Sequence, residues 1–245
     1  MRPRFILFGD SITQQSFSPG GWGAGLTDRY ARKADVVLRG YSGYNTRWAL
    51  FLLGKLFPAG LQDAPALVTI FFGANDAALP DRSHKRQHVP VPEYKANLCE
   101  IISAVKSLSK DTLIVLITPP PVYEKALQET AWKLYGADPE EAFSRTNDAA
   151  GRYAKACVEA AGQAEASVID LWTCMQEKPG WQTRYLRDGL HLTAEGNAVV
   201  FEKLLEVLND KGLSFEAMRW DFPEYGDVNA DNPVKTLWEL QNCGK

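Results

Sequence analysis

The chain is 245 residues long, with 45% hydrophobic and 23% charged residues and a net charge of −3 at neutral pH. Nucleic-acid-binding proteins typically carry an excess of basic residues, which this slightly acidic chain lacks, so we predict no nucleic-acid partner. The hydrophobic content is sufficient for a large core, and no repeat or linker-like stretch divides the chain, which predicts one main domain.

The N-terminus and the cysteines favour an intracellular, reducing location. Only a short apolar run, 5–9, precedes Asp10, which is too little for a signal peptide or a membrane span, so we expect a cytoplasmic protein. The four cysteines form no C-x-x-C pair, so we expect reduced thiols. They are Cys99, Cys157, Cys174 and Cys243. His84 and His88 flank a polar, proline-terminated stretch, which predicts a surface loop and no metal site.

Five apolar runs alternate with segments of helical periodicity. The apolar runs predict strands at 5–8, 34–39, 65–72, 112–118 and 166–171. The periodic segments predict helices at 23–32, 48–56, 92–108, 144–161 and 194–208. Strands that alternate with helices form parallel sheets covered on both faces, so we predict an α/β fold built as a three-layer α/β/α sandwich.

Two segments lie outside this alternation. Segment 122–143 carries aromatic side chains among charges, and we expect it to be an insertion over the ligand crevice. The tail, 212–245, follows the domain formed by 1–211 and is aromatic with little periodicity. Such a tail needs an apolar surface to pack on, either this domain or a partner subunit, which leaves a homodimer open.

The first strand ends in Gly9-Asp10-Ser11, a sharp polar turn. Ser11 is therefore expected at the carboxyl end of a central strand, where open parallel sheets bind their ligands. A serine at that place is a candidate nucleophile. The alternative is that Asp10 and Ser11 only cap a following helix, since both residue types are favoured there.

A serine nucleophile needs a base and a group that orients the base. His191 is the histidine outside the 81–92 loop, and Asp188 precedes it by three residues. One turn can return the carboxylate to Nδ1 of the imidazole and leave Nε2 facing Ser11. Alternatively, Asp188 belongs to an ordinary turn with Gly189, and His191 only precedes a helix capped by Thr193.

Ester cleavage also needs hydrogen-bond donors for the developing oxyanion. Gly43 follows the second strand, where a missing side chain lets its backbone N–H approach a ligand, or it is a plain turn glycine. Asn75 follows the third strand and offers a side-chain amide, or it caps the next helix. Phe17, Trp22 and Tyr44 are candidates for the walls of an apolar pocket, with core packing as the alternative.

Four blocks of the chain resemble the signature blocks of the SGNH (GDSL-type) hydrolase family, in the same order. They are Gly9-Asp10-Ser11, Gly43 within 41–45, Gly73-x-Asn75-Asp76 and Asp188-x-x-His191, and the resemblance covers about 5–209. Within that family the chain is most similar to the isoamyl acetate-hydrolysing esterases. Segments 39–48, 71–77 and 188–192 carry this similarity, with a weaker one at 220–223 and 231–233.

The resemblance implies a five-stranded, flavodoxin-like parallel sheet and specific roles for the matching residues. Ser11 would be the nucleophile, His191 the base and Asp188 its orienter, while Ser11, Gly43 and Asn75 would form the oxyanion hole. It implies no metal and no organic cofactor.

The expected activity is that of a serine esterase, which hydrolyses small-molecule, short-chain acyl (acetate-type) esters through an acyl-enzyme. A thioesterase, a lysophospholipase and a sugar or N-acetyl deacetylase are the alternatives within hydrolases, because they could use the same site. A non-catalytic binding module is the alternative from another class.

Overall fold

The computed structural model describes residues 2–61, 63–136 and 144–236 of the chain. Part of the predicted insertion, 137–143, and the end of the tail, 237–245, with Cys243, lie outside these residues. The other three cysteines are free thiols. Among the described residues, no helix combines the length and the apolar character needed to cross a membrane.

The centre of the molecule is a parallel sheet with the strand order β2-β1-β3-β4-β5. The strands are β1 (Arg4–Gly9), β2 (Asp35–Gly40), β3 (Leu67–Phe71), β4 (Leu113–Ile117) and β5 (Ser167–Ile169). This is the flavodoxin-like order, so the expected fold class is confirmed. Each predicted strand is present, and its bounds differ from the prediction by one or two residues.

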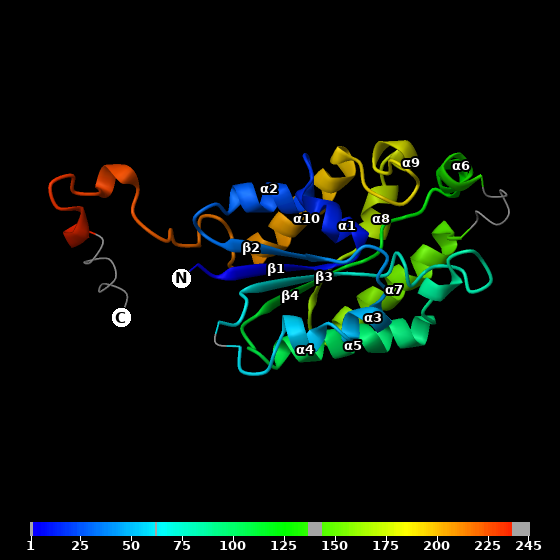
Figure 1. Cartoon of the computed structure of the whole chain (residues 1–245), viewed down its shortest axis with the longest axis horizontal. Helices are drawn as coiled ribbons and strands as arrows, with labels where there is room; N and C mark the ends of the chain where they lie inside the picture. The colour runs from blue at the N-terminus through cyan, green and yellow to red at the C-terminus, as the bar shows by residue number, and fades with distance from the viewer. Residues whose placement is uncertain (1, 62, 137–143, 237–245) are drawn as a thin grey trace.

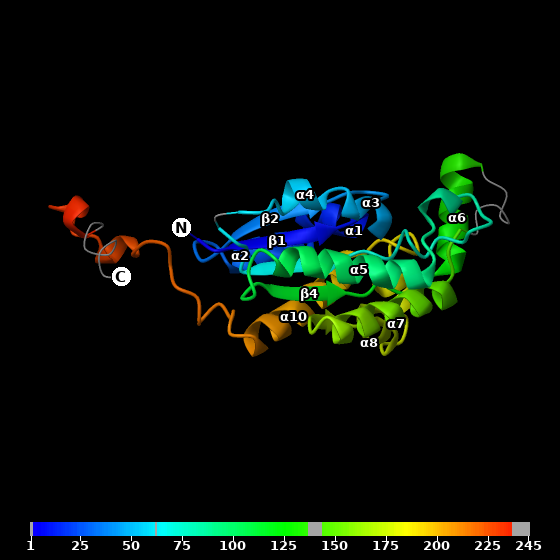
Figure 2. The same ribbon diagram turned by 90° about the horizontal axis from the view of Figure 1, so that it is seen from below.

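Helices cover both faces of the sheet. They are α1 (Ser11–Gln14), α2 (Trp22–Arg29), α3 (Thr46–Leu50), α4 (Leu53–Leu56), α5 (Val91–Lys106), α6 (Glu124–Tyr135), α7 (Asn147–Gln163), α8 (Leu171–Gln176), α9 (Trp181–Arg184) and α10 (Ala194–Asp210). Helices α1, α2, α8 and α10 lie on one face, and α3, α4, α5 and α7 on the other (Figure 1). Helices α5 and α7 pack side by side (Figure 2).

Two expectations about helices were wrong. The helix predicted over 48–56 is divided into α3 and α4, because the chain tightens between them through i→i−3 bonds from the N–H groups of Phe51 and Leu52. The sequence predicts no helix in the stretch before Asp188, but this stretch contains α8 and α9, which are too short to show helical periodicity.

Alternating side chains of the strands supply two hydrophobic layers. Phe5 and Leu7 of β1 face one layer and Ile6 and Phe8 face the other, because successive side chains of a strand point to opposite faces. Each fully buried side chain of this size stabilises the fold by about 1.5–3 kcal/mol. The ends of β1 and its neighbours are therefore held rigidly between two cores.

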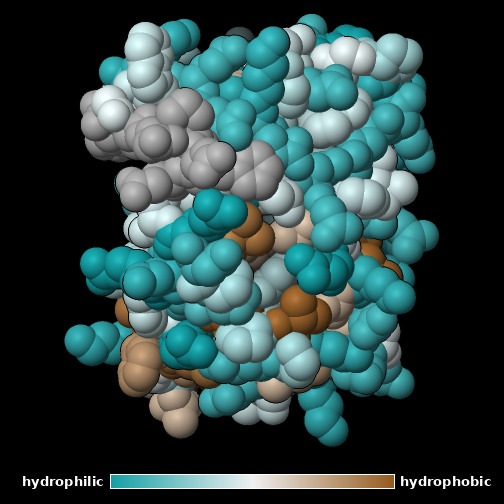
Figure 3. All heavy atoms as spheres, turned by 90° about the vertical axis from the view of Figure 1, so that its right-hand side faces the viewer, coloured by the Kyte–Doolittle hydropathy of each residue, from teal (hydrophilic) through white to brown (hydrophobic). Residues whose placement is uncertain are grey.

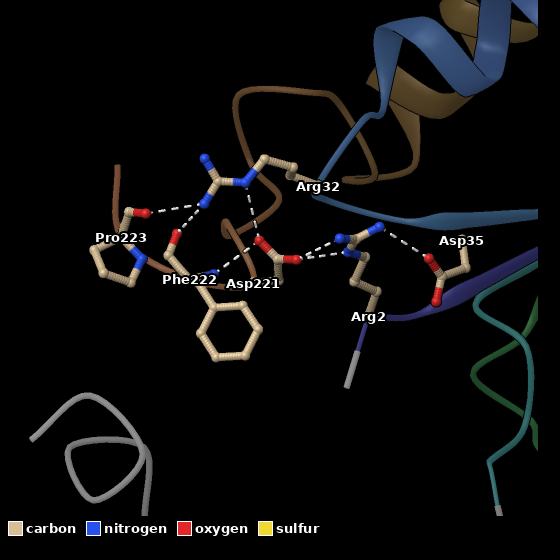
Figure 4. Close-up of polar contacts among 6 residues, drawn as sticks. All are labelled: Arg2, Arg32, Asp35, Asp221, Phe222 and Pro223. Atoms are coloured by element: carbon tan, nitrogen blue, oxygen red, sulfur yellow. Dashed lines mark hydrogen bonds and ion pairs between the residues drawn. The ribbon is translucent and has the colours of Figure 1, made fainter. Parts of the chain in front are cut away.

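The beginning of the tail is fastened to the amino-terminal end of the sheet. The Lys33 ammonium donates to the Phe215 carbonyl at 2.6 Å and lies 3.7 Å from the centre of the Phe215 aromatic ring. The Asp221 carboxylate lies between Arg2 and Arg32, and its shortest contact, to Arg2 Nη2, is 2.6 Å (Figure 4). The following residues, up to 236, extend away from the sheet (Figures 1 and 2). The domain boundary at 211 and a partner subunit stay predictions.

The core assignment predicts a contrast between two phenylalanines. We expect Phe8→Ala to lower the free energy of unfolding by about 3–5 kcal/mol, because Phe8 is fully buried and its removal leaves a cavity. The matched control is Phe51→Ala, which we expect to change it by less than about 0.5 kcal/mol, since Phe51 is 80% exposed. Denaturant titration measures both, and equal losses would contradict the assignment.

Candidate active site

Ser11 begins helix α1 directly at the carboxyl end of β1. Gly9 has to lack a side chain, because a Cβ there would lie 2.5 Å from the Phe71 carbonyl oxygen of the neighbouring strand. Asp10 caps α1, with its Oδ1 accepting from the Ile12 N–H at 2.9 Å. The expected alternative is thus half right: Asp10 is the helix cap, while the Ser11 hydroxyl is free to point elsewhere.

The Ser11 hydroxyl points to an imidazole from the other end of the chain. Ser11 Oγ lies 3.0 Å from His191 Nε2, and His191 Nδ1 lies 2.7 Å from Asp188 Oδ2. Ser11 is buried, whereas the His191 side chain is 24% exposed. The structure therefore brings the three predicted residues into one hydrogen-bonded chain at the carboxyl ends of the strands.

The loop that carries His191 is organised by Asp188. Its Oδ1 accepts from the backbone N–H groups of Leu190 and His191, at 3.0 and 2.7 Å. Burial raises the pKa of Asp188, but the hydrogen bonds and charge of His191 outweigh it and lower this pKa to about 2. The carboxylate is therefore ionised at neutral pH and fixes the ring through Nδ1.

The same loop is braced by the start of the predicted insertion. Gly189 has a φ of +89°, and a Cβ there would lie 2.4 Å from the Tyr123 carbonyl oxygen. The Tyr123 N–H in turn donates to the Gly189 carbonyl at 2.9 Å. Helix α6 begins directly afterwards and stands at the carboxyl end of the sheet (Figure 1). The segment expected over the crevice thus contacts the histidine loop.

Gly43 and Asn75 follow the two strands next to β1. In register, Gly9 pairs with Gly40 of β2 and with Phe71 of β3, so the turns after these strands adjoin Ser11. Gly43 has a φ of +79°, and its N–H has no hydrogen-bond partner within the described part of the chain. The Asn75 amide is buried and donates one N–H to the Tyr44 carbonyl at 2.8 Å, which leaves its second N–H available.

The surface at this end of the molecule is mostly hydrophilic, and hydrophobic side chains show only in small patches between hydrophilic ones (Figure 3). Of the three aromatic residues considered as pocket walls, Trp22 is buried in the core against Phe71. Phe17 is 40% exposed, and Tyr44 packs against Trp48. Trp22 is therefore a core residue, as its alternative reading proposed.

A model of the GDSL-like lipase/acylhydrolase family matches residues 5–204. The chain belongs to this family. It is 52% identical to a GDSL esterase/lipase of Arabidopsis thaliana, over 98% of this chain and 99% of that one. It is 44% identical to the isoamyl acetate-hydrolyzing esterase 1 homolog of Homo sapiens, over 96% and 92%. The expected family is thus confirmed, and the protein is a carboxylic ester hydrolase.

Solved structures of low identity share the fold. A lipase/acylhydrolase from Enterococcus faecalis is 24% identical, with a TM-score of 0.65, and the match covers 91% of this chain and 100% of that one. A catalytic mutant of an acetylxylan esterase from Geobacillus stearothermophilus is 20% identical, with a TM-score of 0.62, covering 88% and 97%.

Two buried carboxyl groups lie behind the site of this GDSL-type hydrolase. Burial raises the pKa of Asp10 and of Asp76 to about 7 in each case. Asp76 Oδ1 accepts from the N–H and the hydroxyl of Thr46, while the second oxygen of each carboxyl has no hydrogen-bond partner among the described residues. Asp76, which follows β3, thereby holds the loop after β2 through Thr46.

Arg145 is a charged residue of this region that the sequence did not predict. Arg145 is buried and donates to Asn75 Oδ1 at 3.0 Å and to Gln87 Oε1 at 2.6 Å. Its sequence neighbours indicate only the start of a helix, so no local signal marks it. The imidazole of His84 contacts Ser83 Oγ, and the imidazole of His88 contacts the Ala78 carbonyl oxygen.

Burial of Asp76 predicts a pH dependence of stability. Its pKa is about 7 in the folded state and about 3.9 in an unfolded chain. The contribution of Asp76 to the free energy of unfolding therefore falls as the pH rises from about 4 to about 7, by up to about 1.4 kcal/mol per pH unit. We expect Asp76→Asn, which keeps the oxygen that Thr46 donates to, to reduce this slope.

The free energy of unfolding at pH 5, 6 and 7 checks this prediction. Asp28→Asn is the control, since Asp28 is exposed, and we expect it to keep the slope of the parent protein. An unchanged slope in Asp76→Asn would contradict a protonated, buried Asp76.

Proposed function

We propose that the protein is a serine esterase that hydrolyses short-chain acyl esters through an acyl-enzyme intermediate. The observation that carries the proposal is the 3.0 Å contact between Ser11 Oγ and His191 Nε2, backed by the 2.7 Å contact between His191 Nδ1 and Asp188. A nucleophile, a base and an orienting carboxylate in this geometry are the parts that acyl transfer requires.

The first half of the reaction forms the acyl-enzyme. His191 Nε2 takes the Ser11 proton as Oγ attacks the acyl carbon, and the ionised Asp188 stabilises the resulting imidazolium. The negative charge develops on the acyl oxygen, and the backbone N–H groups of Ser11 and Gly43 and the side-chain amide of Asn75 would donate hydrogen bonds to it. The imidazolium then returns its proton to the alcohol oxygen as the C–O bond breaks and the alcohol leaves.

The second half restores the enzyme with water as the nucleophile. His191 takes a proton from water, the hydroxide adds to the acyl carbon, and the same donors hold the oxyanion. Ser11 Oγ then leaves with the proton from His191, and the carboxylic acid is released. The chain's own residues supply every proton transfer of this sequence.

Two observations support a short acyl group. The similarity to the human isoamyl acetate-hydrolyzing esterase 1 homolog extends over nearly the whole chain. In addition, Ser11 is only 6% exposed, so the acyl carbon has to enter a confined space to reach Oγ. A small acyl group enters such a space at the lowest cost, because no wall has to move.

Substitution of the nucleophile tests the mechanism. We expect Ser11→Ala to abolish hydrolysis of a chromogenic acetyl ester and labelling by a fluorophosphonate probe, with unchanged circular dichroism. Ser103→Ala, at an exposed position of α5, is the control and should keep full activity and labelling. A folded Ser11→Ala protein with normal turnover would exclude the serine mechanism.

Chain length of the acyl group tests the substrate class. We expect kcat/KM for a 4-nitrophenyl ester to fall by at least about tenfold from the acetyl to the octanoyl ester, since an extra methylene group that the pocket does not accommodate weakens transition-state binding by about 1–3 kcal/mol. Matched thioester and N-acetyl compounds belong in the same assay. A preference for the octanoyl ester, the thioester or the amide would instead assign a lysophospholipase, thioesterase or deacetylase activity.

A further inference from the structure

Arg145 carries a buried charge next to the oxyanion donors. It lies just before Thr146, the N-cap of α7, and it is only 5% exposed. Its Nε donates to the Ala74 carbonyl at 2.7 Å, and its Nη2 donates to Asn75 Oδ1 at 3.0 Å. A buried guanidinium is costly to desolvate, so its presence beside Asn75 calls for more than a contribution to stability.

Arg145 fixes which way the Asn75 amide points. The amide is held at both ends: Oδ1 accepts from Arg145, and Nδ2 donates to the Tyr44 carbonyl at 2.8 Å. A flipped amide would place its NH2 group against a cation and its oxygen against a carbonyl oxygen, so both contacts would become repulsive. The remaining N–H of Asn75 is thereby held in one direction.

Gln87 connects the same guanidinium to Gly43. Its Oε1 accepts from Arg145 at 2.6 Å, and its Nε2 donates to the Gly43 carbonyl at 3.0 Å. Its backbone carbonyl accepts from the Asn45 side chain at 2.8 Å, which holds Gln87 in place. Two of the three expected oxyanion donors, Asn75 and Gly43, are therefore tied to one side chain.

We propose that Arg145 is the positioning residue of the oxyanion hole: it orients the Asn75 amide directly and helps to hold Gly43 in place through Gln87, which donates to the Gly43 carbonyl. This inference rests on the proposed function, because a hole of this kind is used only when an oxyanion forms. Arg145 does not touch the substrate and acts through Asn75 and Gly43. Its benefit is therefore expected in the transition state, and so in kcat rather than KM.

A double-mutant cycle between Arg145 and Asn75 tests the proposal. Arg145→Met and Asn75→Ala are made singly and together, and kcat and KM are measured with a chromogenic acetyl ester. We expect Asn75→Ala to lower kcat by roughly 10²- to 10³-fold. We expect Arg145→Met to lower kcat by at least about tenfold with KM within about twofold. In the Asn75→Ala background the same substitution should cost less than about threefold, because its main target is gone.

Controls separate positioning from loss of structure. Arg152→Met changes an exposed arginine of α7 and should leave kcat and KM unchanged. If Arg145→Met is unfolded by circular dichroism, Arg145→Lys replaces it in the cycle, since lysine keeps the charge but lacks the planar fork that reaches two acceptors.

Two results would overturn the proposal. One is an equal fold-loss from the Arg145 substitution with and without Asn75, and the other is a rise in KM at unchanged kcat. Ser11→Ala in the same assay tests the proposed function separately from the positioning role of Arg145. Ester hydrolysis that depends on Ser11, together with equal losses at Arg145, would retain the serine mechanism and remove the positioning role.

Discussion

The parallel register of three neighbouring strands is the constraint on which the site depends. Gly9 of β1 lies beside Gly40 of β2 and Phe71 of β3, so the chain leaves the sheet three times at the same level. Ser11, Gly43 and Asn75 come from these three exits. Hydrophobic side chains on both faces of the sheet hold the exits rigidly, which lets a few small polar groups keep a fixed geometry.

Much of this arrangement could be predicted from the sequence, and the reason is local spacing. The apolar runs that form β1, β3 and β4 are continuous because both faces of the sheet are buried there, and short polar blocks follow β1, β2 and β3. Asp188 and His191 are three residues apart, so one turn is enough to join them. Helices of 16 or 17 residues, such as α5 and α10, also show their period clearly.

Features that depend on distant contacts could not be predicted in this way. Arg145 follows the insertion in a stretch that indicates only a helix start, and its partners Asn75 and Gln87 are 70 and 58 residues away. Helices α8 and α9 have six and four residues, so they are too short for a periodic pattern. The division between α3 and α4 likewise depends on local hydrogen bonds that composition does not reveal.

The close approach of Gly189 to Tyr123 links two parts of the molecule that would otherwise vary independently. A chain that lengthens or shortens the connection between β4 and α7 has to preserve the backbone position at Tyr123, or else the turn that carries His191 loses its support. In the evolution or engineering of such an enzyme, the first residues of this connection are therefore confined to one path.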